Sequence, residues 1–122
     1  MLFDTHAHYD DKRFDPDRDE LLASLPAHDI GLILNPGCDV ETSRKAVSYA
    51  QKYAFVYAAV GIHPENINES WNNDLSVIQE LAQTEPKVRA IGEIGLDYYW
   101  EKDEHARARQ QVVFARQMEL AR

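Results

Sequence analysis

The chain has 122 residues, of which 44% are hydrophobic and 28% charged, a balance typical of one globular domain. Thirteen Lys and Arg against 21 Asp and Glu give a net charge of −8, which excludes a broad basic surface for binding nucleic acid. A single cysteine excludes an intramolecular disulfide. Because no apolar run approaches the roughly 18 residues of a membrane span, and residues 1–8 do not resemble a signal peptide, we expect a cytoplasmic protein with no membrane partner.

Four short apolar runs alternate with longer amphipathic stretches along the chain. The apolar runs, which predict strands, cover residues 2–5, 30–34, 55–60 and 88–94. The amphipathic stretches predict helices over residues 17–27, 40–53 and 74–83, and a last helix that begins near Asp103 and continues to residue 122. This alternation favours βαβ units and a parallel sheet.

The strand runs are almost continuously hydrophobic, as expected for a parallel sheet that is covered on both faces. About 120 residues suit a compact α/β domain, whereas a closed (β/α)8 barrel typically takes about 250. The last predicted helix carries no glycine cap, proline or other stop signal. We therefore expect residues 1–122 to be one unit that represents the first half of a larger fold.

Polar residues stand where each predicted strand ends. They are His6 and His8, Asn35, His63 and Glu93. In parallel α/β folds, the carboxyl ends of the strands carry the ligand site. The sequence therefore predicts one site at this edge of the sheet.

His6 and His8 are the best candidates for metal ligands. Residues two apart on a strand point to the same face, so both imidazoles can converge on one ion. Imidazole is a common ligand for zinc and similar metals, although two histidines at a frayed strand end can also simply face solvent. Asp4 shares their face and either orients an imidazole or hydrogen-bonds to the neighbouring strand.

Glu93 is the candidate carboxylate of the site. It stands between isoleucines and glycines, where burial is costly unless the carboxylate is paired or bound to a metal; a helix cap or an arginine pair is the alternative. His63 follows the third strand, and it either contacts a phosphate or moves a proton near neutral pH, or packs within its loop. Asp97 is a second candidate carboxylate or stabilises the turn into Tyr98.

Three further features have weaker functional interpretations. Residues 98–100, two tyrosines and a tryptophan, either stack on a base or, as we expect, pack over the next helix. Cys38 is expected to be a small buried residue. His28 and His105 stand in helical or helix-edge positions and are assigned no functional role.

Three motifs together resemble the TatD family of metal-dependent deoxyribonucleases. They are residues 3–8 (FDTHAH), 60–64 (VGIHP) and 91–99 (IGEIGLDYY). The resemblance implies a (β/α)8 TIM barrel with two divalent metal ions, Mg, Mn or Zn, that hydrolyses phosphodiester bonds of DNA. It implies that residues 1–122 are the N-terminal half of that barrel, which is truncated here. It also implies that His6 and His8 bind one metal, that Glu93 binds or bridges both, and that His63 lies by the scissile phosphate. Two more histidines and an aspartate would follow beyond residue 122.

Two divalent ions about 4 Å apart activate a water and clamp the phosphate, so local charge can hold a substrate that the net charge repels. We expect residues 1–122 alone to be inactive and to self-associate. Two alternatives stay open. One is a non-catalytic half-barrel that associates through its open sheet edges, and the other is an amidohydrolase-like enzyme acting on amides or lactones.

Overall fold

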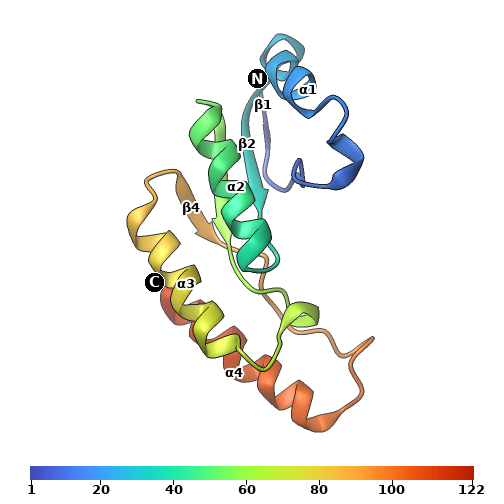
Figure 1. Ribbon diagram of the computed structural model, residues 1–122, viewed down its shortest axis with the longest axis vertical. Coiled ribbons are helices and arrows are strands. Elements are labelled where there is room, and N and C mark those ends of the chain that lie inside the picture. Colours follow the sequence, from blue (N-terminus) through green and yellow to red (C-terminus); the bar gives the residue numbers. More distant parts are fainter.

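Four parallel strands lie side by side in chain order in the computed structural model, which describes residues 1–122 (Figure 1). They are β1 (Leu2–Asp4), β2 (Ile30–Pro36), β3 (Val56–Val60) and β4 (Val88–Ile91). Each strand pairs in parallel with the next, and a helical segment connects each pair. The predicted parallel sheet of βα units is therefore confirmed.

The helices are α1 (Arg18–Ser24), α2 (Val40–Lys52), α3 (Trp71–Thr84) and α4 (Glu104–Leu120). Short 3-10 turns cover Lys12–Phe14, Leu25–His28 and Pro64–Asn66. Aspartates begin two of the long helices, because the side chains of Asp39 and Asp103 accept hydrogen bonds from backbone N–H groups of the first turn. No helix is long and apolar enough to cross a membrane.

Three elements show the largest differences from the prediction, and β2 ends at Pro36, two residues beyond its expected end. The helix expected over residues 17–27 divides into α1 and a 3-10 turn, because Pro26 cannot donate the backbone hydrogen bond that an α-helix needs there. Helix α3 begins at Trp71, three residues before the expected start, in a polar stretch without apolar periodicity. Strand β4 ends at Ile91 instead of residue 94, so Glu93 lies just past the strand.

The hydrophobic core lies between one face of the sheet and the helices. Its members come from α1, the strands, α2, α3 and α4, and include Leu22, Ile33, Ala46, Val56, Val60, Ile78 and Val113. Every buried side-chain nitrogen and oxygen has a hydrogen-bond partner. The core therefore holds the carboxyl ends of the strands in a fixed arrangement.

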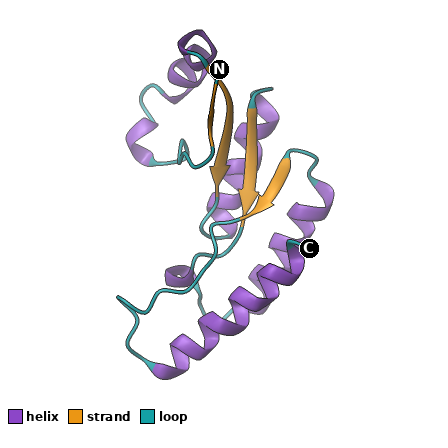
Figure 2. Ribbon diagram, turned by 180° about the vertical axis from the view of Figure 1, so that it is seen from behind, coloured by secondary structure: helices purple, strands orange, loops and turns teal.

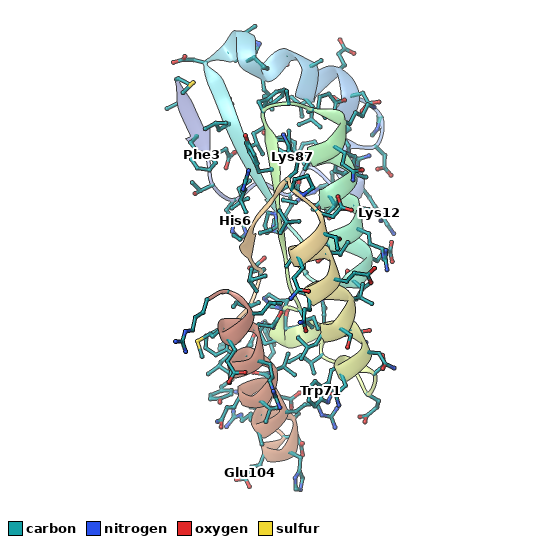
Figure 3. All side chains as sticks on the ribbon, turned by 90° about the vertical axis from the view of Figure 1, so that its left-hand side faces the viewer. Phe3, His6, Lys12, Trp71, Lys87 and Glu104 are labelled. Atoms are coloured by element: carbon teal, nitrogen blue, oxygen red, sulfur yellow. The ribbon has the colours of Figure 1, made fainter.

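The opposite face of the sheet is uncovered, contrary to the expectation that both faces are covered (Figure 2). Phe3 is 54% exposed there, on the side away from α2 and α3 (Figure 3), and shares a shallow apolar surface with Leu32, Leu34 and Tyr57. In a closed barrel the inner face is filled by side chains of the remaining strands, which explains why these strands are apolar on both sides.

Candidate metal centre

The loop after β1 carries both candidate histidines. The loop is held against β2, because Ala7 N–H donates to the Leu34 carbonyl over 3.2 Å. His6 and His8 flank Ala7 and turn to the same side, so their Nε2 atoms are 3.1 Å apart and their rings meet edge to face. The predicted convergence of the two imidazoles is thus present in the fold, and their role as metal ligands stays a prediction.

Glu93 follows β4, at the opposite edge of the sheet from β1, and reaches the two histidines from there. Its own N–H donates to the Gly37 carbonyl over 2.6 Å, which ties the segment after β4 to the end of β2. The Glu93 Oε2 atom lies 3.5 Å from His6 Nε2 and 3.4 Å from His8 Nε2. Three side chains from the first and fourth βα units therefore meet at one point.

The spacing of these three atoms fits a divalent metal ion. Metal–ligand bonds of about 2.0–2.2 Å at the tetrahedral angle place neighbouring ligand atoms about 3.3–3.6 Å apart, and neighbouring octahedral positions are about 2.8–3.0 Å apart. The observed separations of 3.4 and 3.5 Å lie in the tetrahedral range, and the separation of 3.1 Å lies between the tetrahedral and octahedral ranges. Two imidazole nitrogens and one carboxylate oxygen are donors that zinc, manganese and related ions accept.

A close contact between two strand exits positions Glu93. A Cβ added to Gly61 would lie 2.8 Å from the carbonyl carbon of Gly92 and 2.9 Å from the Ile94 side chain. Only glycine lets the end of β3 approach the segment after β4 this closely. Because Gly92 directly precedes Glu93, this close contact at Gly61 positions the backbone from which the Glu93 side chain extends.

A second carboxylate beside the histidine pair is that of Asp10, which the sequence did not indicate. Asp10 Oδ1 lies 3.8 Å from His8 Nδ1, and the fully buried Asn35 donates to the same oxygen over 3.1 Å while its own Oδ1 accepts from Tyr9 N–H. Asp4 was expected to orient an imidazole or to hydrogen-bond to the neighbouring strand. Its carboxylate instead accepts from the backbone N–H of His6. The only feature of the sequence that could have indicated this role of Asp10 was its position two residues after His8.

His63 faces the same carboxylate from the end of β3. Its Nδ1 atom accepts a hydrogen bond from Glu65 N–H over 3.2 Å, so the neutral ring carries its hydrogen on Nε2. Nε2 lies 4.0 Å from Glu93 Oε1, the oxygen that does not face His6 and His8. His63 therefore presents a proton donor beside the site and not a free ligand nitrogen.

A buried glutamine of α4 fixes the segment that leads to His63. The Gln117 side chain accepts from Ile62 N–H over 2.7 Å and donates to the Ile62 carbonyl over 3.1 Å. His63 N–H in turn donates to the Cys38 carbonyl over 2.8 Å. Gln117 is only 1% exposed, and nothing in its helical position distinguished it in sequence from a solvent-facing polar residue.

Cys38 contacts the site, although the sequence indicated only a small buried residue. Its thiol lies 3.6 Å from Glu93 Oε2 and donates to it. Burial, and then the negative charge of Glu93, raise the pKa of Cys38 to about 12. At neutral pH the thiol is therefore protonated.

The remaining candidates lie outside the His6–His8–Glu93 cluster. Asp97 stabilises a turn, because its carboxylate accepts from the N–H groups of Tyr99 and Trp100 over 2.9 and 3.0 Å. The expectation that the aromatic residues pack over the next helix is wrong for two of them, since Tyr99 and Trp100 are 74% and 71% exposed. His28 and His105 are exposed and far along the chain from the cluster.

Comparison with known proteins identifies the class of protein that this arrangement represents. Residues 3–122 match the family model for TatD-related DNases. The uncharacterized metal-dependent hydrolase YabD of Bacillus subtilis is 40% identical over 122 residues, which cover 100% of this chain and 47% of YabD. The 3'-5' ssDNA/RNA exonuclease TatD of Cronobacter turicensis is 32% identical over 98% of this chain and 44% of that protein.

The fold agrees with that match. The crystal structure of YjjV, a TatD homologue from Escherichia coli K12, superposes with a TM-score of 0.82 at 32% identity, covering 98% of this chain and 46% of that one. The chain belongs to the TatD-related DNase family and spans about half the length of these relatives. Its sheet corresponds to part of a TIM barrel.

Proposed function

We propose that this chain contributes the first metal site and the phosphate-facing histidine of a hydrolase that cleaves phosphodiester bonds in DNA. The observation that carries the proposal is the convergence of three ligand atoms, from His6, His8 and Glu93, at the carboxyl ends of β1 and β4. The similarity to a protein named as a single-stranded DNA and RNA exonuclease supports a nucleic-acid substrate.

Each side chain has a distinct task in the proposed reaction. His6, His8 and Glu93 would hold one ion. The Glu93 Oε1 atom does not face His6 and His8 but lies 4.0 Å from His63 Nε2, so we propose that Glu93 would also help to hold a second divalent ion in the complete site. When bound, such ions supply an activated water and positive charge for the phosphate. His63 donates its Nε2 hydrogen to a phosphate oxygen or to the leaving group.

The chain spans about half the length of its relatives, so the proposal concerns only part of a complete site. The chain covers 47% of YabD and 44% of the Cronobacter exonuclease. We assign residues 1–122 to the N-terminal half of the barrel and place the remaining ligands outside them. Of the three ligands, only Glu93 is left to reach a second ion, so we expect that ion to be poorly held and residues 1–122 by themselves to be inactive.

A second role, self-association, rests on the uncovered sheet face. Phe3, Leu32, Leu34 and Tyr57 expose apolar surface, and β1 and β4 are unpaired edges. Surface of this kind favours association. In residues 1–122 alone, a second copy is the proposed occupant of this face.

The decisive experiment measures hydrolysis of single-stranded DNA by the complete product of the gene, with Mg, Mn or Zn added. Changing His6→Ala or Glu93→Ala is expected to lower turnover at least a thousandfold, because no water is activated. His63→Ala is expected to lower turnover about tenfold to a thousandfold, the scale of one lost transition-state contact. The exposed His105→Ala is the matched control.

The proposal is refuted by a Glu93→Ala enzyme with unchanged turnover at saturating metal. It is equally refuted if amide or lactone substrates are hydrolysed by the His6-dependent site while DNA is not. Calorimetric titration with each metal supplies a measurement that does not depend on turnover.

A further inference from the structure

The loop between β4 and α4 carries two aromatic rings that the fold does not use. In Figure 1 this loop projects away from the strands, beyond the carboxyl end of the sheet. Tyr99 and Trp100 are 74% and 71% exposed, and their rings meet edge to face with centroids 4.7 Å apart. Single exposed apolar residues are common, but packing within residues 1–122 does not account for two adjacent large rings with so little cover.

The exposure of these rings does not come from a loose loop. The Asp97 carboxylate accepts from the N–H groups of both aromatic residues. The buried amide of Gln110 accepts from Asp97 N–H over 2.8 Å and donates to the Asp97 carbonyl over 3.1 Å, so helix α4 holds the base of the loop. The backbone is fixed, and the two rings are presented outward on it.

Tyr98, the preceding aromatic residue, shows what a structural role looks like in this loop. Its hydroxyl accepts from the Gln111 amide over 2.8 Å, and the Arg107 guanidinium lies over its ring at 4.9 Å. Arg107 also donates to the Tyr98 carbonyl. Tyr98 is therefore tied to α4, whereas Tyr99 and Trp100 are not.

The surroundings of the two free rings suit a nucleotide chain. The Lys102 ammonium lies 5.7 Å from the Tyr99 ring centre, on the same loop. Trp100 lines a cleft of about 260 Å³ together with Arg109, which pairs with Glu69, and with Pro64, the residue after His63; Glu65 and Glu101 line the same cleft. Proteins hold single-stranded nucleic acid with aromatic side chains, on which bases stack, and with nearby cations. The cleft joins this surface to the segment that presents His63.

We propose that Tyr99 and Trp100 form a stacking platform for unpaired bases of a single-stranded nucleic acid whose backbone runs toward His63. This inference rests on the proposed function, and it adds the reason for a single-stranded substrate. In a duplex the bases are paired and their faces are stacked within the helix, so the rings have no base face to meet. The platform also gives a chain with net charge −8 a way to bind nucleic acid that does not depend on a basic surface.

The test is a binding measurement in EDTA, so that neither metal nor hydrolysis contributes. The complete gene product is titrated into a fluorescein-labelled 12-mer of thymidine at 50 mM salt, and anisotropy gives the dissociation constant. Trp100→Ala is expected to weaken binding about tenfold, and Tyr99→Ala by a similar or smaller factor, because each removes one base stack. Trp100→Phe keeps a ring and is expected to stay within about threefold of wild type.

Two controls separate stacking from other causes. A 12-mer of the same length with abasic sugars has the same charge and no bases, so Trp100→Ala is expected to leave its binding unchanged. Quenching of tryptophan fluorescence by unlabelled thymidine 12-mer is expected to diminish in Trp100→Phe and to persist in Trp71→Phe, since Trp71 packs against the core.

The proposal is overturned if Trp100→Ala binds the thymidine 12-mer within twofold of wild type, or if it weakens the abasic strand equally. It is also overturned if the oligonucleotide causes no Trp100-dependent quenching, the outcome expected of a loop that meets another protein. Failure of the proposed hydrolysis is recognised separately, as absent turnover in a wild-type protein whose binding still depends on Trp100.

Discussion

Replacing Gln117 with leucine tests whether α4 fixes the segment that carries His63. Leucine has a similar volume but can neither accept from Ile62 N–H nor donate to the Ile62 carbonyl, two contacts of 2.7 and 3.1 Å. Ile62 is 1% exposed, so water does not replace the lost partners. Each buried backbone group left without a partner costs about 1–3 kcal/mol, or about 2–6 kcal/mol for both.

The apolar leucine side chain offsets part of this cost by about 1–2 kcal/mol. The two ranges leave about 0–5 kcal/mol, and we expect Gln117→Leu to lower the free energy of unfolding by the middle of that range, about 2–3 kcal/mol. This is a large fraction of the roughly 5–15 kcal/mol typical of a domain. Urea unfolding of the complete gene product, followed by circular dichroism, measures the change. Only the midpoint is expected to move, because the surface exposed on unfolding is nearly the same.

The matched control is Gln111→Leu on the same helix. Gln111 is exposed and reaches only the Tyr98 hydroxyl, so its change is expected to stay within about 0.5 kcal/mol. A Gln117→Leu protein that loses less than about 1 kcal/mol would show that the amide does not hold Ile62 in solution. Equal losses in both variants would assign the effect to helix α4 in general.

Three further outcomes follow from the geometry. Gly61→Ala places a methyl group against the backbone before Glu93, so metal affinity is expected to fall about tenfold in calorimetric titration, and unchanged affinity would contradict the close contact. Hydrogen bonds from Lys52 and Tyr53 hold the pKa of Asp19 below its usual value, so their stabilising effect is present above about pH 3.9 and is lost as the pH falls through the lower folded value. Asp19→Asn is expected to remove that part of the acid dependence in unfolding curves between pH 2 and 5. Residues 1–122 expressed alone are expected to scatter light as oligomers, with Phe3→Lys shifting them toward monomer, and a monomeric parent chain would refute association through the open face.

The parallel sheet and the histidine pair could be predicted from sequence because both depend on local pattern. Short apolar runs separated by helical stretches specify βα units. His6 and His8 are two residues apart, so a strand-like backbone turns them to one side. Glu93 could be added because a carboxylate among glycines and isoleucines is costly without a partner. The structure brings these three side chains together.

The supporting contacts could not be predicted, because most of them depend on residues that are far apart in the chain and the others on the path of a loop. Gln110 and Gln117 look like solvent-facing positions of an amphipathic helix, yet both are buried against backbone groups of distant loops. Asp4 shares the face of the histidines, but local loop geometry turns its carboxylate to a backbone N–H instead. Asp10 reaches His8 only because buried Asn35 holds it there. Tertiary packing determines which hydrogen-bond partner each of these polar side chains has.

The hydrogen bonds between Gln117 and Ile62 also set the order in which this part of the protein is completed during translation. A ribosome adds Ile62 55 residues before Gln117, which at about 5–20 residues per second is a delay of roughly 3–11 seconds. The pairing of β1, β2 and β3 needs only residues that have already been synthesised. The segment ahead of His63 therefore acquires its final partners only when α4 has emerged and docked. The carboxyl edge of the sheet, where His63 lies, is completed after the pairing of β1, β2 and β3.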